Sequence, residues 1–483
     1  MKHSFLVAMP AFVVLTACLP YNPVESAAPP LSIPESFTAG DEVIAEGDSH
    51  IGVEPWWQAF GDPTLNALEE RALGDSFQLR AGWARLSQAR AVAEQAGAPR
   101  WPTVGIQLSA GRQRQVFGSA GVQEFSSFSA SVPVSYEIDL FNRIGATATA
   151  ADLDARATRD DVEALAISIS AEVAEAYFNL VEIRQRTTLL ESQLASNDIF
   201  AELTSLRFQT GQASALDVYQ QQATVQGTRA RIALLDAEVR VAENRLRAIV
   251  GVAPGGTITA GPQELPDLGE LPSPGLPSTL LMRRPDVRSA QRRVSAADYR
   301  VGAAIADRFP SLRLQGSIGF GAPNLTQLFA DVVWSLIGSI SQSIMDGGRR
   351  AAEVDRNKAV VQERLEQFGQ VVLTALIEVD NSITGERAQL ANVEELERQY
   401  ETIDSTLTEA RNRYRMGLTD YLNVLTALVA QQNAQMSLLA AKRRILSTRI
   451  QLHRALGGTW TQRLAEPEPR EVRDLNDDSE TDG

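Results

Sequence analysis

The chain has 483 residues, a formal net charge of −15 and a pI near 4.9. Because no basic stripe is present to neutralise phosphates, the composition argues against nucleic acid as a partner. There is one cysteine, Cys18, and there are three histidines, His3, His50 and His453. We therefore expect no disulfide framework, no metal site, no cofactor and no catalytic residue.

The N-terminal residues 1–17 have the pattern of a secretory signal peptide. Lys2 and His3 precede an apolar run that is too short to span a bilayer as a helix. Small residues precede Cys18, as in the lipobox of bacterial lipoproteins, where the cysteine becomes the acylated first residue. We expect lipidation at Cys18; the alternative is an ordinary signal peptide with an incidental cysteine. Residues 18–55 then read as a lipidated, extended N-terminal tether.

The first repeat covers residues 56–251. Asp62 followed by Pro63 predicts a helix start, and the helical pattern continues to about Ala98. Two strands are predicted at about 103–115 and 126–139, where apolar residues alternate with small polar ones. This pattern is typical of strands that span a membrane; two hairpins of a soluble sandwich are the alternative. A long helical hairpin follows, with its tip near 209–214.

A Pro/Gly-rich linker, residues 252–281, leads into the second repeat at 282–460. The order is the same: a helix, strands at about 311–320 and 333–344, and a long helical hairpin with its tip near 415–420. Apolar residues recur every three or four positions along the hairpins, which indicates a heptad seam. Residues 461–483 are acidic, and we predict a disordered tail there. No later segment has the length of a transmembrane helix, so a membrane crossing would have to use strands.

The two halves are copies of one unit. Residues 207–218 align without gaps on residues 413–424, and residues 100–103 match residues 308–311. In each copy a glycine, Gly211 or Gly417, interrupts the helical pattern and predicts the turn. A duplication of this length predicts one elongated body built from two similar halves.

Four strands cannot close a barrel in lipid, because an open sheet leaves two edges of unpaired backbone groups in hydrocarbon. A long hairpin only two helices thick also buries little surface without neighbours. We therefore expect several copies to pool their strands and hairpins into one tube. The small polar residues that alternate with the apolar ones would line a hydrated passage.

Four stretches resemble the TolC-like outer-membrane efflux proteins, in particular the NodT-type lipoprotein branch that serves RND pumps. They are the two tips with Gly211 and Gly417, and the segments 56–65 (WWQAFGDPTL), 135–143 (SYEIDLFNR) and 283–290 (RRPDVRSA). The resemblance implies a mainly α fold with a transmembrane β part. Four strands per protomer would form a trimeric, 12-stranded outer-membrane barrel above a periplasmic α-helical barrel. The linker at 252–281 would lie in an equatorial belt.

The resemblance also implies location, partners and function. The chain would be a lipid-anchored homotrimer in the outer membrane with a large periplasmic part. Its partners would be a periplasmic adaptor protein, an inner-membrane RND-type transporter and outer-membrane lipid. It would conduct small molecules passively and would not be an enzyme. Two alternatives stay open: the duct of a type I protein-secretion system, and a lipid-anchored periplasmic coiled-coil scaffold.

Site residues are carried over from the family to the two tips. The adaptor-docking residues would be Arg207, Gly211, Gln212, Ser214, Arg413, Gly417, Leu418 and Asp420. A periplasmic gate near the second tip would use Asp404, Glu409, Asn412 and Arg413, unless these are ordinary solvated charges. Arg207 and Arg413 could instead join neighbouring hairpins by ion pairs.

Other positions have structural interpretations. We expect the two glycines to supply turn geometry. We expect four residues just past the turns to be core positions: Leu216, Val218, Leu422 and Val424. Asp286 with Arg283 indicates a helix N-terminus, and His453 lies on a helical pattern without a nearby partner.

Overall fold

The computed structural model describes residues 21–24, 26–34, 36–37, 54–116, 122–257, 264–269, 271–272 and 277–468. The predicted signal peptide, Cys18 and residues 469–483 lie outside this range. The chain forms two compact units. The first contains Leu86–Thr158 and Ser289–Gly369 with the N-terminal segment to Pro30. The second contains Leu31–Arg85, Arg159–Arg288 and the chain from Gln370 onward.

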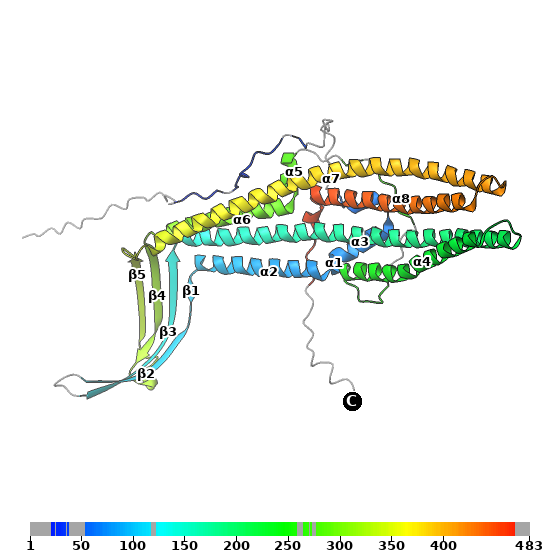
Figure 1. Cartoon of the computed structure of the whole chain (residues 1–483). Coiled ribbons are helices and arrows are strands. Elements are labelled where there is room, and N and C mark those ends of the chain that lie inside the picture. The colour runs from blue at the N-terminus through cyan, green and yellow to red at the C-terminus, as the bar shows by residue number, and fades with distance from the viewer. Residues whose placement is uncertain are drawn as a thin grey trace, which may run out of the picture. The chain divides into compact units, whose positions relative to one another are not determined.

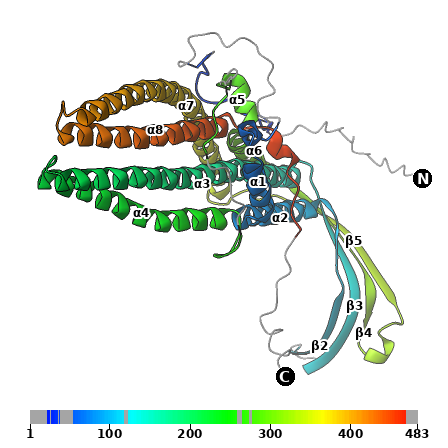
Figure 2. The same ribbon diagram turned by 90° about the vertical axis from the view of Figure 1, so that its right-hand side faces the viewer.

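The first unit holds one antiparallel sheet, whose strands run side by side in Figures 1 and 2. Its strands are β1 (Thr103–Val104), β2 (Gln107–Val116), β3 (Val122–Ile138), β4 (Ser311–Ala322) and β5 (Val332–Ser341). Both β1 and β2 pair with β3, β3 pairs with β4, and β4 pairs with β5. The strands of the two repeats therefore join into one continuous sheet through the β3–β4 pair.

The predicted strand at 103–115 is split between β1 and β2. Pro133 of β3 lies opposite the split, and its carbonyl accepts the N–H of Gly105 at 3.0 Å. Proline has no N–H to return a ladder hydrogen bond, so the ladder is interrupted there. The structure also extends β3 to 17 residues and ends β5 at Ser341, three residues before the predicted end.

The start of the predicted tether, from Tyr21 to Ala27, is bound to α6 (Pro285–Ala306). The hydroxyl of Tyr21 donates to Asp298 Oδ1 at 2.6 Å, and the N–H of Val24 donates to Asp298 Oδ2 at 2.7 Å. The Gln291 amide donates to the carbonyl of Ala27 at 3.0 Å. Burial, and secondarily the hydrogen bond to the buried carboxylate of Asp298, raises the pKa of Tyr21 to about 12.

The chain forms two long helical hairpins, whose tips and most of whose length belong to the second unit. One consists of α3 (Arg143–Gln209) and α4 (Ala215–Ile249), and the other of α7 (Arg349–Arg415) and α8 (Tyr421–Leu456). Ion pairs tie the helices of each hairpin, such as Arg184–Glu243 at 2.9 Å and Lys442–Glu397 at 2.9 Å. In α3 one window is apolar enough to cross a membrane, but 67% of it is buried, as in a core helix.

Buried amides join the two hairpins to each other. Asn197 of α3 accepts from Gln432 of α8 at 2.9 Å and donates to Thr228 of α4 at 3.1 Å. Gln221 of α4 donates to the Asn197 carbonyl at 2.7 Å and accepts from the Tyr421 hydroxyl at 2.5 Å. All five side chains are buried. Because an unpaired buried amide is costly, this network favours one register of the hairpins.

The Trp56–Leu65 motif forms an aromatic cluster on α3 and α8. Asp62 caps α1 (Pro63–Asp75) by accepting the N–H groups of Thr64 and Leu65, which confirms the predicted helix start. The prediction of a single helix to Ala98 is wrong, because the backbone is extended at Ser76 before α2 (Phe77–Gly97). Gly251, after α4, lies so close to the Asp75 carbonyl that an added Cβ would be 2.9 Å from its oxygen.

His453 belongs to this cluster, so the expectation that it has no nearby partner is wrong. Its ring stacks on Trp56 with centroids 5.3 Å apart and lies 6.4 Å from the ring of Phe60. Burial, and secondarily the charge of Arg449, lowers the pKa of His453 to about 4.

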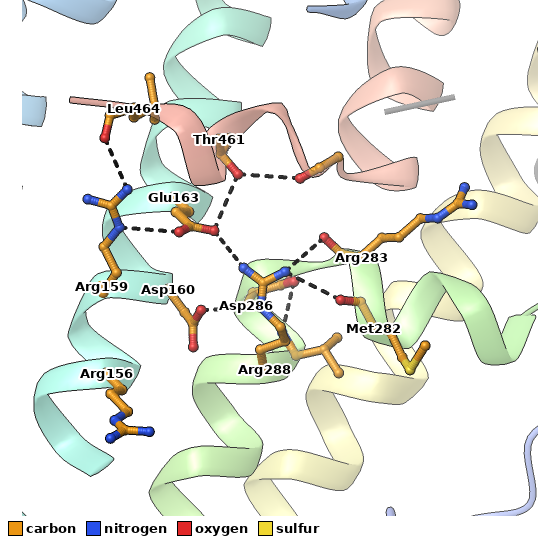
Figure 3. Close-up of polar contacts among 12 residues, drawn as sticks. Arg156, Arg159, Asp160, Glu163, Met282, Arg283, Asp286, Arg288, Thr461 and Leu464 are labelled. Atoms are coloured by element: carbon orange, nitrogen blue, oxygen red, sulfur yellow. Dashed lines mark hydrogen bonds and ion pairs between the residues drawn. The ribbon is translucent and has the colours of Figure 1, made fainter. Parts of the chain in front are cut away.

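Residues 283–288 form an ionic clamp around α5 (Pro277–Arg283), α6 and the C-terminal turn η5 (Trp460–Arg463) (Figure 3). Arg288 binds Asp160 at 3.2 Å and Glu163 at 2.5 Å, and Glu163 also accepts from Thr461 at 3.3 Å. Arg159 donates to the carbonyl of Leu464 at 3.1 Å. The predicted disorder from 461 onward is therefore wrong at its start, since Thr461 is fully buried.

The neighbouring Arg284 completes the clamp. It is buried and binds Asp286 at 2.7 Å, Glu378 at 2.8 Å and the carbonyl of Ala455 at 3.1 Å. Asp286 lies in the first turn of α6, as expected for a helix N-terminus, and Arg284 binds its carboxylate.

Replacing His453 by phenylalanine should weaken the dependence of stability on pH. The folded pKa of His453, about 4, lies below its unfolded value of 6.5, so the unfolded chain binds more protons between these values. Stability should therefore fall by up to about 1.4 kcal/mol per pH unit as the pH drops through this window. We would measure thermal midpoints of the parent and His453→Phe from pH 7 to about pH 4.5. Parallel curves for the two proteins would contradict this account.

Candidate functional site

The sheet has one apolar face, and that face is exposed. The register places the apolar residues of neighbouring strands side by side, for example Val132, Ile318 and Trp334. Trp334 and Ile340 are 72% and 75% exposed, where a soluble protein would bury them. β4 and β5 contain 12 and 10 residues. That length suits strands that cross a hydrocarbon core, which takes about 9–11 residues.

The opposite face of the sheet is polar and rich in serine. Hydroxyl groups form pairs across the strands, Ser109 with Ser129 at 2.7 Å and Ser317 with Ser335 at 2.9 Å. The register brings Gln315 beside Ser135 on the same face. These neutral groups can hydrogen-bond water along the sheet, as the wall of a water-filled passage requires.

The apolar face ends at an ion pair beyond the apolar residues. Arg112 of β2 binds Glu124 of β3 at 2.6 Å, and both side chains are largely exposed. Both residues occupy positions that continue the apolar face. Charges at these positions suit water and not lipid, so the hydrocarbon-facing part of this hairpin ends before Arg112.

The sheet has two free edges among the described residues. β2 pairs only with β3, and β5 pairs only with β4. Each edge exposes backbone N–H and C=O groups that water would satisfy but lipid would not. A sheet with an exposed apolar face and two free edges is therefore incomplete as a single copy in a membrane.

The two hairpin tips are closed by the same backbone motif. Gly211 and Gly417 have φ values of 75° and 73°, a conformation that suits glycine, so their turn role is confirmed. The N–H of Gln212 donates to the Arg207 carbonyl at 2.7 Å, and the N–H of Leu418 donates to the Arg413 carbonyl at 2.9 Å. These are Schellman closures, with the glycine just past the helix end.

Side-chain contacts engage three of the predicted docking residues, Arg207, Ser214 and Arg413. Ser214 caps α4 in a capping box with Asp217, whereas Asp420 makes no cap hydrogen bond at the start of α8. Arg207 stacks its guanidinium 4.2 Å from the ring of Tyr414 and donates to the Tyr414 carbonyl at 3.5 Å. Arg207 thus joins the two hairpins of one chain through an aromatic ring.

The predicted gate residues lie on the last turns of α7. Glu409 accepts from Arg413 at 2.8 Å within this helix, and both side chains are 61% exposed. Asn412 is also exposed. Asp404 is engaged differently, since it accepts from Gln431 of α8 at 2.7 Å. Glu409, Asn412 and Arg413 therefore present polar groups to solvent, while Asp404 fastens the hairpin.

Two of the four expected core positions past the turns are wrong. Leu216 and Leu422 are 64% and 56% exposed, whereas Val424 is fully buried and Val218 half-buried. The inward position at the start of α8 is taken by Tyr421, whose ring lies 5.6 Å from that of Tyr414. Leu216, Leu418 and Leu422 give the tips an exposed apolar character.

A cleft of about 660 Å³ opens between the tips. Its walls include Arg207, Asp217, Tyr414, Asp420 and Leu422. Sequence reasoning missed the tyrosine pair, which joins the end of α7 to the start of α8, and the buried amide network, which depends on partners from the other half of the chain. The only local signal was the presence of Gln and Asn on the buried side of otherwise apolar seams. Among the residues that the structure describes, no group of His, Cys, Asp and Glu is arranged to hold a metal ion.

The chain matches known proteins along most of its length. The family model described as "Outer membrane efflux protein" matches residues 68–252 and 276–458. The pyoverdine export outer membrane protein OpmQ of Pseudomonas aeruginosa is 31% identical over 478 residues, covering 94% of this chain and 98% of that protein. Nodulation protein T of Rhizobium leguminosarum bv. viciae is 27% identical, covering 96% of each.

Solved structures of outer-membrane proteins have the same fold as this chain. The outer-membrane channel OprN superposes with a TM-score of 0.84 at 30% identity, covering 90% of this chain and 98% of that chain. The outer membrane protein VceC of Vibrio cholerae gives a TM-score of 0.79 at 28% identity, covering 84% and 98%. The expected fold class, long helical hairpins with a membrane sheet, is confirmed. The chain belongs to the outer membrane efflux protein family.

Proposed function

We propose that this chain is the outer-membrane channel of a tripartite efflux pump and conducts small molecules passively out of the cell. The observation that carries the proposal is the sheet, with its exposed apolar face, its serine-lined face and its two free edges. The apolar face argues against a periplasmic scaffold, because exposed Trp334 and Ile340 would be unfavourable in water. Energy would come from an inner-membrane transporter of the RND type, so no catalytic group is required.

The channel would be a homotrimer. Pairing β5 of one copy with the β2 edge of the next would satisfy the free edges and close a 12-stranded barrel. The same assembly would line the hairpins into a helical tunnel and cover their exposed apolar residues, such as Leu234 and Val241.

The function is tested by purification and by genetics. The detergent-extracted protein should cross-link as a trimer and conduct ions in planar bilayers. A strain without the gene should become several-fold more sensitive to compounds that its pump exports, and the intact gene should restore resistance. A stable monomer without conductance would refute the proposal.

Cys18 is proposed as the lipid attachment site, following the lipobox pattern at residues 15–18. Because it is the only cysteine, labelled palmitate should be incorporated into the parent and be absent from Cys18→Ala. Equal labelling of both proteins would rule this site out.

The tips are proposed to dock a periplasmic adaptor through their exposed side chains, and Glu409, Asn412 and Arg413 to form a gate nearby. Leu418→Asp places a charge on a residue that is 71% exposed, so it should abolish drug resistance while leaving bilayer conductance unchanged. Glu409→Ala removes the pair with Arg413 and should raise conductance by about twofold or more.

The matched control for the gate is Glu394→Ala. Glu394 pairs with Arg398 at 3.0 Å on the same helix, is similarly exposed, and lies further from the tip. If Glu394→Ala raises conductance as much as Glu409→Ala, the gate does not lie at Glu409. If Leu418→Asp keeps full resistance, Leu418 does not contribute to docking.

A further inference from the structure

Where β3 ends and β4 begins, two guanidinium groups share one carboxylate. Arg143 Nη2 lies 2.6 Å from Oε1 of Glu137, and Arg313 Nε lies 3.3 Å from Oε2. The side chain of Glu137 is only 18% exposed, whereas that of Arg313 is 57% exposed. One carboxylate can neutralise one guanidinium, so these three side chains together keep one positive charge, and the more exposed Arg313 presents it.

Arg313 lies on the polar face of the sheet. The register aligns Glu137 of β3, Arg313 of β4 and Ser339 of β5 in one row across the strands. Four residues further along β4, Ser317 and Ser335 form a hydroxyl pair on the same face. Because β4 pairs on both sides within the chain, a second copy that joined at β2 or β5 would not cover Arg313 by strand pairing.

A cavity of about 700 Å³ lies against this row. Arg313, Ser339, Ser341 and Gln315 of the polar face line it, together with residues from the ends of neighbouring helices. Two further carboxylates line it, and neither pairs with Arg313; Asp139, whose partner is a neutral N–H group, keeps its negative charge. Asp139 accepts the N–H of Gly145 at 2.7 Å near the start of α3, and Asp307 binds Arg350 at 3.1 Å.

The guanidinium of Arg313 has donors to spare. Its Nε is bound to Glu137, while neither Nη atom makes a hydrogen bond or an ion pair with the described residues. A planar fork of N–H donors is suited to carboxylate, sulfonate and phosphate groups. Serine hydroxyls beside it can supply further donors to the same solute.

We propose that Arg313 is a specificity-determining residue of the passage and favours anionic small solutes where they enter the sheet. The proposal rests on the proposed function, since only a closed wall of several copies turns the polar face into a lumen. A symmetric assembly repeats Arg313 once per copy, which gives a ring of equivalent positive charges. Since Arg313 is more than half exposed, the preference should be strongest at low ionic strength.

The test is ion selectivity of the full chain in planar bilayers, with potassium and chloride as the probe ions. The zero-current potential under a KCl gradient gives the permeability ratio of chloride to potassium. Arg313→Glu should lower this ratio by about twofold or more, and Arg313→Gln should lower it less. Arg313→Lys keeps the charge and should keep the ratio of the parent.

Glu137→Gln supplies a test of the opposite sign. It releases the charge of both arginines and should raise the ratio, and a folding defect cannot shift the ratio in opposite directions in the two variants. The matched control is Arg112→Gln, which removes an exposed, paired arginine from the other face of the sheet and should leave the ratio unchanged. At about 1 M salt, where the Debye length is about 3 Å, all differences should shrink.

The outcomes separate the two claims. If the parent conducts but Arg313→Glu and Glu137→Gln keep its permeability ratio, Arg313 does not set selectivity and the inference is overturned. A parent that does not conduct at all overturns the proposed function and the inference with it.

Discussion

The structure depends on the need of every backbone N–H and C=O group for a partner inside lipid. One copy meets this need for β3 and β4, which pair on both sides, and leaves it unmet along β2 and β5. Because each unpaired group in hydrocarbon costs several kcal/mol, a lone sheet has no stable place in a membrane. Serine alternates with apolar residues along the strands, so each face of the sheet already has its polarity before copies associate. When the edges pair into a closed wall, the serine face meets water and the apolar face meets lipid.

The hairpins meet a related constraint by other means. Two helices bury too little apolar surface to hold each other, and polar bonds supplement the seam. Asn197, Gln221 and Gln432 connect α3, α4 and α8 in the interior, and Arg207 on the ring of Tyr414 connects the tips. Far from the tips, Arg284 and Arg288 bind Glu163 of α3, Glu378 of α7 and the last turn of α8. Specific polar contacts therefore fix the register that apolar packing alone would leave free.

What the sequence predicted was local, and what it missed depended on distant segments. Period-two and heptad patterns located strands and hairpins, and Asp62, Gly211 and Gly417 marked a cap and two turns through their own backbone preferences. Pro133 was inside the predicted strand at 126–139. Only the pairing of β3 with β1 and β2 shows why the neighbouring strand predicted at 103–115 breaks opposite Pro133. His453 and Thr461 were misjudged because Trp56 and Glu163, which decide their surroundings, lie far away in sequence. Leu422 was misjudged because its neighbour Tyr421 takes the inward position and binds Gln221 of the first repeat. The tip and gate roles remain predictions.

The hydrogen bond between Tyr21 and Asp298 limits how far Cys18 can lie from the folded chain. Only Leu19 and Pro20 separate Cys18 from Tyr21, so the two Cα atoms are at most about 11 Å apart. Tyr21 itself touches the last turns of α6, where an added Cβ on Gly302 would lie 3.3 Å from its ring, and β4 begins a few residues later. An acyl group on Cys18 would therefore lie close to the start of β4. The anchor would hold this end of the sheet at a nearly fixed distance from the lipid that it enters.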